Sequence, residues 1–265
     1  MKYLNTKNRA ILREMVATDF KVRYQGSVLG YFWSLLKPLF LFAILYIIFT
    51  FIMPIGKNVE HYAVTLLLGI VFWNFFSETT TIGASSVVAN GDLIRKISIP
   101  RYLVVLSSSF SALINLFLSL VVVFIFALMN GVAPHLSWLL LPIFIIELFI
   151  FSLGVAFILA TAYVKYRDVT YIWEVVLQAG FYSSAIIFPL IIVSEDLRKW
   201  FFINPIVQIT QDARRALVPS TDNITLWDIH NIPLIKIAPF VIIAVCCVWG
   251  FVYFKRKSKY FAEDI

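Results

Sequence analysis

Charged residues are scarce in this sequence. Only 14% of its 265 residues are Asp, Glu, Lys or Arg, whereas soluble globular domains carry about 25%. Because 61% of the residues are hydrophobic, a globule of this size would lack the polar residues needed to cover its surface. The scarcity of charge therefore excludes an ordinary soluble enzyme and a disordered protein, and it indicates an integral membrane protein.

Residues that hold metals, disulfides or nucleotides are also few. The only cysteines, Cys246 and Cys247, are adjacent within an apolar run and predict neither a disulfide framework nor a metal site. His61, His135 and His230 lack the spacing of metal ligands. The sequence contains no G-x-x-x-x-G-K-[ST] phosphate loop. We therefore expect no cofactor in this chain, and any ATP-driven activity needs another subunit.

The apolar residues gather into long continuous runs. A helix needs about 20 apolar residues to cross a bilayer. Six runs reach that length, and none shows the alternation of a membrane β-strand. The sequence thus predicts an all-α integral membrane protein with one transmembrane domain, residues 1–265, and six spans at 30–53, 62–88, 103–129, 136–164, 171–193 and 233–254.

The net charge of +7 is distributed unevenly between the predicted loops. One side of the membrane receives fifteen Lys and Arg residues and the other receives five. Cytoplasmic loops carry such an excess, so we expect both termini in the cytoplasm and no nucleic-acid partner.

Two segments outside the spans are predicted to be helical. In 6–24, the residues Ile11, Leu12, Met15 and Val16 share one helical face beside a basic face. This pattern favours an amphipathic helix in the cytoplasmic interface, in contact with membrane lipids, although a helix packed on another protein surface is the alternative. The outer loop 194–232 is too long for a turn, and we expect one or two short helices in it.

The cytoplasmic loop 90–101 has the pattern of a short amphipathic helix. Asn90 and Gly91 signal a turn, Asp92 is a candidate cap, and Pro100 ends the segment. A short helix of this kind is suited to docking in a groove of a partner protein, whereas the alternative is a solvated basic loop. The residues assigned to docking are Asn90, Asp92, Leu93, Ile94, Arg95, Lys96, Ile97, Pro100 and Arg101.

Charged residues inside the predicted spans are candidates for function. Glu78 and Glu147 are isolated acids in the second and fourth spans. They form either an ion path or hydrogen bonds to Ser, Thr or Tyr of neighbouring helices, and the second interpretation is favoured because a proton carrier needs a chain of such groups. Lys37, near the inner end of the first span, is expected to extend toward the interface.

Four stretches of the sequence resemble the membrane subunits of ABC-type polysaccharide exporters, the permeases for O-antigen, capsule and teichoic acid. They are residues 19–38 (DFKVRYQGSVLGYFWSLLKP), residues 90–101 (NGDLIRKISIPR), residues 166–169 (YRDV), and Asn204-Pro205 followed by Arg214. The sequence departs from the family at 183–186, where Ser-Ser-Ala-Ile replaces the frequent Ser-Pro-Val.

The resemblance implies a homodimer with two ATP-binding cassette subunits, which hold the ATP and Mg. It implies a bacterial cytoplasmic (inner) membrane protein that exports a lipid-linked polysaccharide, and it makes 90–101 the coupling helix. It also implies that the first and fifth spans of both protomers line the translocation path.

Aromatic residues in those two spans are candidate sugar contacts, since C–H faces of sugars pack on aromatic rings. Such rings are also common at lipid-facing and interfacial positions, which is the alternative. Arg167 and Asp168 are expected to form a local ion pair that positions the turn before the fifth span. The candidate contacts are Phe42, Tyr46, Phe49, Tyr171, Phe181, Tyr182 and Phe188.

Two other functions remain open on the sequence alone. The same architecture serves a lipid, a drug or a small glycolipid as cargo. A membrane-embedded enzyme or assembly scaffold is the third interpretation, and it is disfavoured because no cluster of acids or histidines faces a membrane surface.

Overall fold

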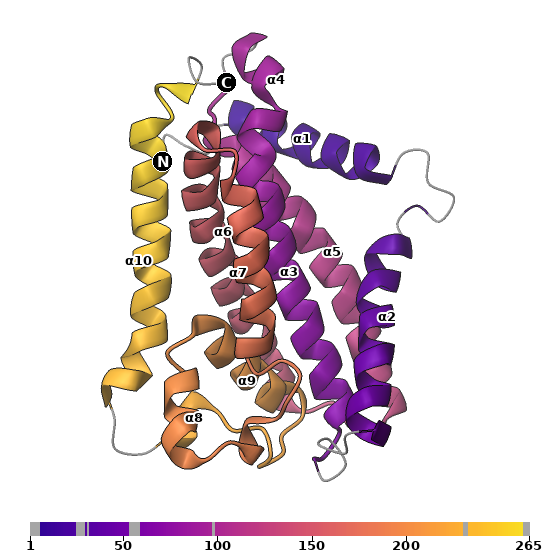
Figure 1. The fold of residues 1–265 in the computed structure, drawn as a ribbon. Helices are drawn as coiled ribbons and strands as arrows, with labels where there is room; N and C mark the ends of the chain where they lie inside the picture. The colour runs from indigo at the N-terminus through magenta and orange to yellow at the C-terminus, as the bar shows by residue number, and fades with distance from the viewer. Residues whose placement is uncertain are drawn as a thin grey trace.

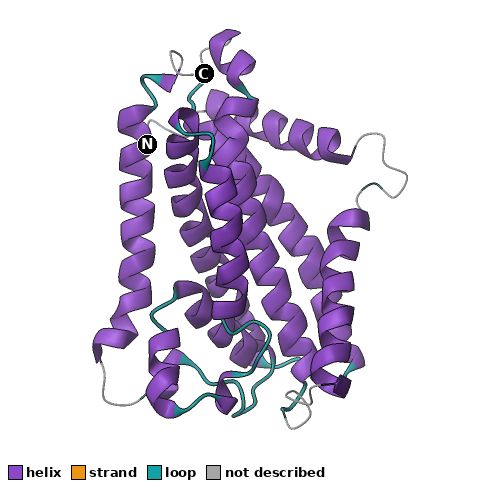
Figure 2. Ribbon diagram, viewed as in Figure 1, coloured by secondary structure: helices purple, strands orange, loops and turns teal. Residues whose placement is uncertain are grey.

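The computed structural model describes residues 6–24, 30, 32–52, 59–96, 99–229 and 233–261. These residues form helices joined by loops, with no strand among them (Figure 2). The long helices are α2 (Phe32–Ile47, continued by a π-helical turn over Ile48–Ile52), α3 (Tyr62–Ala89), α5 (Tyr102–Met129), α6 (Leu141–Lys165, preceded by a 3-10 turn over Leu136–Leu140) and α10 (Pro233–Lys257). The all-α prediction is confirmed.

Five of the predicted spans correspond to helices that are long and apolar enough to cross a bilayer. They cover Phe32–Ile52, Tyr62–Ala89, Tyr102–Met129, Leu136–Lys165 and Pro233–Lys257. α3 is the central one, since most of its surface is buried, and it packs against α5 and α6. α10 packs on the far side of α6, and α2 lies beside α3 and α5 (Figure 1).

Small residues allow these helices to approach closely. A Cβ atom at Gly83 of α3 would meet Ala156 of α6, and one at Gly154 of α6 would meet the backbone of Cys247 on α10. Close backbone approach of this kind is the usual way in which membrane helices associate. The polar residues of α5 are accommodated within the helix, because Ser107, Ser108 and other serines donate to carbonyls three or four residues back.

The predicted fifth span, 171–193, is only partly helical. Its helix, α7 (Val169–Ser183), has 15 residues and is about 22 Å long, shorter than the roughly 30 Å hydrocarbon core. Ala185 adopts a left-handed conformation with φ of 50°, which a continued right-handed helix does not allow, and a 3-10 turn follows at Leu190–Ile192. The described residues therefore show five of the six predicted spans as helices long and apolar enough to cross a bilayer, and the count of six is not confirmed.

The shorter helices lie at the two ends of the bundle. α1 (Thr6–Tyr24) and α4 (Gly91–Lys96) lie at the end where α10 finishes, which we call the α4 end (Figure 1). α8 (Glu195–Phe201) and α9 (Pro205–Leu217) occupy the opposite end, the α9 end, where two short helices were predicted (Figure 1). A short 3-10 turn at Leu226–Asp228 follows them. The first and last described helices thus reach the same end of the bundle.

The apolar face of α1 packs on the bundle. Met15 is buried in one cluster with Ile94 of α4 and Val104 of α5, and Ile11 packs against it. Asn8 donates a hydrogen bond from Nδ2 to the Tyr102 hydroxyl at 3.2 Å. This contact agrees with the alternative in which the helix packs on protein.

Candidate functional site

α7 exposes a polar stripe along its length. Tyr171, Glu174, Gln178 and Tyr182 recur at i, i+3, i+7 and i+11 and are all exposed. The helix is attached to the bundle by its opposite side, where Leu177 is buried and the Trp173 indole donates to Thr80 Oγ1 at 3.0 Å. Polar side chains in a membrane segment face water or protein rather than lipid. Ile172, Val175 and Val176 are exposed beside this stripe, so this side of α7 is suited to a protein partner or to a path lined by both polar and apolar side chains.

The structure divides the predicted aromatic contacts into two groups. Tyr171 and Tyr182 belong to the exposed stripe, with 69% and 62% of their surfaces accessible. Phe181 instead packs on Trp73 of α3, with ring centroids 5.9 Å apart. Phe188 lies beyond the end of α7 and contacts Phe201 of α8 at 6.0 Å. The four residues predicted in the fifth span therefore do not form one surface.

The predicted stripe in α2 is also divided. Phe42 is 8% exposed and packs edge-on against Phe126 of α5 at 5.3 Å, so its ring faces the core of the protomer. Tyr46 and Phe49 are half-buried, and Tyr46 stacks on Phe42. Of these three rings, Tyr46 and Phe49 retain surface for contact with another molecule.

A buried arginine holds the segment that follows α7. Arg214 of α9 is 3% exposed. It donates to the carbonyls of Thr65 at 2.9 Å, Ala185 at 3.0 Å and Ile186 at 2.6 Å. Buried carbonyls outside regular helix require such partners, because a buried polar group without one costs free energy. Arg214 thereby fixes the left-handed turn to α3 and α9.

Two residues of α3 complete this arrangement, which we call the Arg214 node. The Tyr62 hydroxyl donates to the carbonyl of Ile187 at 2.5 Å. Gly69 leaves the space that the guanidinium occupies, since a Cβ atom there would overlap Arg214 Nη2. Burial lowers the pKa of Arg214 to about 10, which leaves the guanidinium protonated at neutral pH. The sequence pattern identified Arg214 but not the partners it holds.

Glu147 is not isolated, contrary to the sequence interpretation. Its Oε2 accepts from Gln208 Nε2 of α9 at 3.5 Å, and the same nitrogen donates to Asp212 Oδ2 at 2.9 Å. Burial raises the pKa of Asp212 to about 6, while hydrogen bonds from Gln208 and the Leu226 backbone oppose the rise. Glu147 thus hydrogen-bonds an amide, where a hydroxyl was expected. Gln208 and Asp212 were missed because their partner is distant in sequence.

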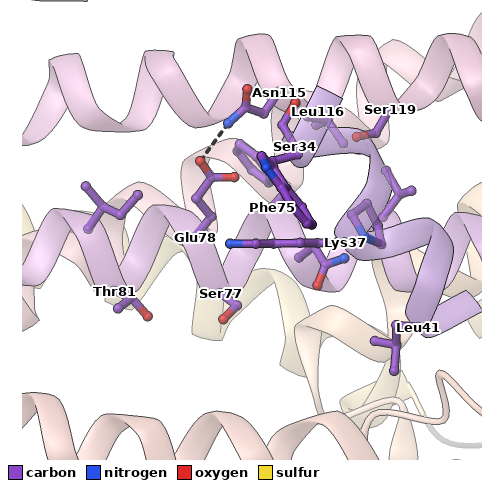
Figure 3. A pocket seen from close by; sticks show the side chains of 15 residues that line it. Ser34, Lys37, Leu41, Phe75, Ser77, Glu78, Thr81, Asn115, Leu116 and Ser119 are labelled. Carbon is purple, nitrogen blue, oxygen red and sulfur yellow. Dashed lines mark hydrogen bonds between the residues drawn. The ribbon is translucent and has the colours of Figure 1, made fainter. Parts of the chain in front are cut away.

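Glu78 lines a hollow between α2, α3 and α5, with a volume of about 920 Å³ (Figure 3). Its Oε1 accepts from Asn115 Nδ2 of α5 at 2.7 Å. Lys37 of α2 lines the same hollow and extends toward Glu78 (Figure 3), so it does not simply reach for the interface. The acid has an amide partner, as Glu147 does. Elsewhere in the described ranges, no three His, Cys, Asp or Glu side chains come together as a metal site.

The apolar side of the 90–101 segment faces the bundle. Ile94 is 8% exposed and belongs to the same buried cluster as Met15, while Asp92 is exposed. Asn90 ends α3 by donating from Nδ2 to the Ser86 carbonyl at 2.9 Å, and Arg101 donates to the carbonyl of Ser258 after α10. Ile97 lies outside the described residues, as do the side chains of Arg95 and Lys96; Leu93 is half-buried and Pro100 is partly exposed.

The turn before α7 differs from its prediction. The Arg167 guanidinium lies over the Tyr163 ring at 5.1 Å rather than pairing with Asp168, which stands at the N-cap of α7. A cation–π contact of an exposed arginine contributes about 0.5–1 kcal/mol, so this contact orients the turn more than it stabilises the fold.

Comparison with known proteins places these features in context. Residues 12–217 match the family described as ABC-2 type transporter. The chain is 28% identical over 246 residues to an O-antigen export system permease protein RfbA of Klebsiella pneumoniae, covering 92% of this chain and 91% of that protein. It is 27% identical over 203 residues to the RfbA protein of Myxococcus xanthus, covering 76% and 77%. It is 23% identical over 209 residues to the polysialic acid transport protein KpsM of Escherichia coli, covering 76% and 78%.

Proposed function

Because the chain belongs to the ABC-2 type transporter family, we propose that it is the membrane subunit of an ATP-driven exporter of lipid-linked polysaccharide. The observation that carries this proposal is the similarity to an O-antigen export permease along 92% of the chain. In the proposed assembly two copies of the chain form a homodimer on two ATP-binding cassette subunits, which hold ATP and Mg. This chain contributes the membrane path and no ATPase site.

The polar stripe of α7 supports the assignment of the path. Exposed tyrosine, glutamate and glutamine side chains would be unfavourable against lipid tails, and pairing two protomers removes them from lipid. The rings of Tyr171 and Tyr182 offer faces for sugars, while Glu174 and Gln178 offer hydrogen-bonding groups. Tyr46 and Phe49 of α2 contribute the second wall, as the resemblance implies. A glycan then moves along rings and polar groups rather than through an apolar slot.

The α4 end is assigned to the cytoplasm and to the ATP-binding partners. α4 follows α3 directly, and its Ile94 belongs to a buried cluster with residues of α1, α5 and α6, so a force on α4 would act on this cluster. Among the described side chains of the segment, Asp92 is exposed and Leu93 is half-buried, and we assign both to docking. With this orientation both termini lie in the cytoplasm of a bacterial inner membrane protein, and α8 and α9 lie on the outer side.

The proposal is tested by export in cells and by purification. A strain that lacks the gene should lose surface polysaccharide and accumulate lipid-linked glycan inside, and the wild-type gene should restore export. An ATP-binding cassette subunit should co-purify in mild detergent at equal stoichiometry. Surface glycan that persists in the deletion strain while export of a smaller lipid is lost would assign the second cargo class instead.

The α7 stripe has its own matched test. Tyr171→Ala and Gln178→Leu should reduce export at unchanged protein level, because both side chains are exposed while the anchoring residues Trp173 and Leu177 are kept. Val245→Ala is the control, since Val245 is similarly exposed on α10, where the surface is apolar. Equal export by all three variants would remove α7 from the path.

A further inference from the structure

The hollow between α2, α3 and α5 is lined by one face of each helix. On α3 the lining residues Asn74, Ser77, Glu78 and Thr81 recur at i, i+3, i+4 and i+7. They are half-buried on a helix whose other side chains in this stretch are mostly buried. α2 contributes Ser34, Lys37 and Leu41 with the same periodicity, and α5 contributes Asn115 and Ser119. Its volume of about 920 Å³ is at the upper end of small-molecule sites, which span about 300–1,000 Å³.

The hollow combines opposite charges within membrane-spanning helices. Figure 3 shows the Lys37 side chain extending beneath Glu78, whose carboxylate is held by Asn115 Nδ2 at 2.7 Å. Charged side chains at this depth are rare, face the interior or a water-filled cavity, and mark functional sites by default. An acyl chain in the hollow would offer no hydrogen-bonding group to the Lys37 ammonium or the Asn74 amide. The lining therefore favours an occupant that carries polar groups.

The lining groups favour a phosphate joined to a sugar. The Lys37 ammonium is a point charge suited to phosphate, while the Glu78 carboxylate and the Asn74 and Asn115 amides suit sugar hydroxyls. Trp33 and Phe75 add aromatic surface, which packs on the C–H faces of sugars. A free phosphate would fill only a small part of the volume of about 920 Å³.

We propose that this hollow binds the phosphate-bearing sugar at the lipid end of a glycolipid, with the phosphate at Lys37 and the sugar between Glu78 and Asn115. The inference rests on the proposed function, because it names the part of the cargo that the chain recognises. The hydroxylated head group of phosphatidylglycerol shares the chemistry of phosphate plus hydroxyls, and the experiment separates these two sources.

Binding is measured on the full chain purified in mild detergent, with farnesyl diphosphate-linked N-acetylglucosamine as the probe and tryptophan fluorescence as the readout. Wild-type protein should bind the probe saturably, and Lys37→Met should weaken binding about tenfold or more, since it removes a charge-assisted contact. Lys236→Met is the matched control, because Lys236 lies on α10 over the Trp227 ring; its affinity should equal the wild-type value. Ser77→Leu narrows the hollow without altering charge and should also weaken binding.

Two further binding experiments distinguish recognition of the sugar from recognition of the phosphate. Glu78→Gln keeps an oxygen acceptor for Asn115 and should weaken binding of the sugar probe while binding of farnesyl diphosphate is retained. Dihexanoyl phosphatidylglycerol should compete poorly with the probe. The proposal is overturned if the wild-type chain shows no saturable binding, if Lys37→Met binds as the wild type does, or if phosphatidylglycerol competes as well as the unlabelled probe.

The outcome is distinguishable from failure of the proposed function. If the chain exports polysaccharide but does not bind the probe, the proposed site is wrong and the proposed function stands. If the chain binds the probe saturably at Lys37 but deletion of its gene leaves polysaccharide export unchanged, the site stands and the proposed function is wrong. Thermal unfolding of each variant in detergent identifies those that fold, and Ser77→Leu and Lys37→Met provide independent tests of the same hollow.

Discussion

Replacing Arg214 tests whether one side chain holds the non-helical segment after α7. Arg214→Met removes three hydrogen bonds, to Thr65, Ala185 and Ile186. A hydrogen bond to a charged group contributes about 1.5–3 kcal/mol, and removing a buried charge recovers part of its desolvation cost. We therefore expect a net loss of roughly 3–5 kcal/mol, which corresponds to a fall in Tm on the order of 10 °C.

The local consequence is measured by cysteine labelling. Ile187 is 7% exposed, so a cysteine introduced there, in a chain whose Cys246 and Cys247 are replaced by alanine, should react slowly with a maleimide. The Arg214→Met change should accelerate that reaction, because the carbonyls of the turn lose their donors. Arg215→Met is the control, since its guanidinium bonds the carbonyls of Ser220 and Asn223 instead.

Two results with these variants would contradict this prediction. If Arg214→Met leaves both the Tm and the maleimide rate at Ile187 at their wild-type values, the segment is held by other contacts. If Arg215→Met accelerates labelling as strongly, the effect belongs to α9 as a whole and not to the node.

Three further predictions concern Asp212, Gly69 and the 90–101 segment. Asp212 has its pKa raised to about 6 by burial, so the folded protein binds a proton more tightly than the unfolded chain. The free energy of unfolding should therefore fall as pH rises from about 4 to 6, by at most about 3 kcal/mol from this group. The Tm difference between Asp212→Asn and wild type should grow over that pH range. A difference that stays constant would contradict the raised pKa of Asp212. Gly69→Ala should lower the free energy of unfolding by about 1–3 kcal/mol, because the added Cβ atom overlaps Arg214. The same change should have little effect in the Arg214→Met background. Additive losses of stability would show that the two residues act separately. Asp92→Lys should reduce ATPase activity of the complex with an unchanged Tm, whereas Ile94→Glu should lower the Tm as well because Ile94 is buried; full activity of Asp92→Lys would argue against docking at α4.

The spans were predictable because apolar run length alone determines whether a helix can cross a bilayer. The predicted fifth span is helical only as far as Ser183, and Arg214 holds the left-handed turn at Ala185 through a contact between distant residues that hydropathy does not show. α1, which matches the predicted 6–24, was predictable from periodicity. Its packing against α5 was not, because the partner comes from another part of the chain.

The candidate sites were less accessible to sequence reasoning. The Arg214 node joins residues 62–69, 185–187 and 214, and no local pattern links them. Glu174 and Gln178 of α7 were not predicted as part of the site, although their spacing from Tyr171 is visible in the sequence. Phe42 fitted the expected stripe by spacing, but only the packing of α5 shows that its ring points inward.

The unbroken length of α3 has a mechanical consequence. Its 28 residues span about 42 Å, with α4 attached through Asn90 at one end and the Tyr62 and Thr65 contacts of the Arg214 node near the other. A hydrogen-bonded helix resists compression along its axis. A force applied at α4 would therefore displace the residues at the opposite end of α3. The two ends of the bundle are thereby linked by one continuous helix. A glycine pair or a proline introduced into its middle would interrupt the mechanical connection between them.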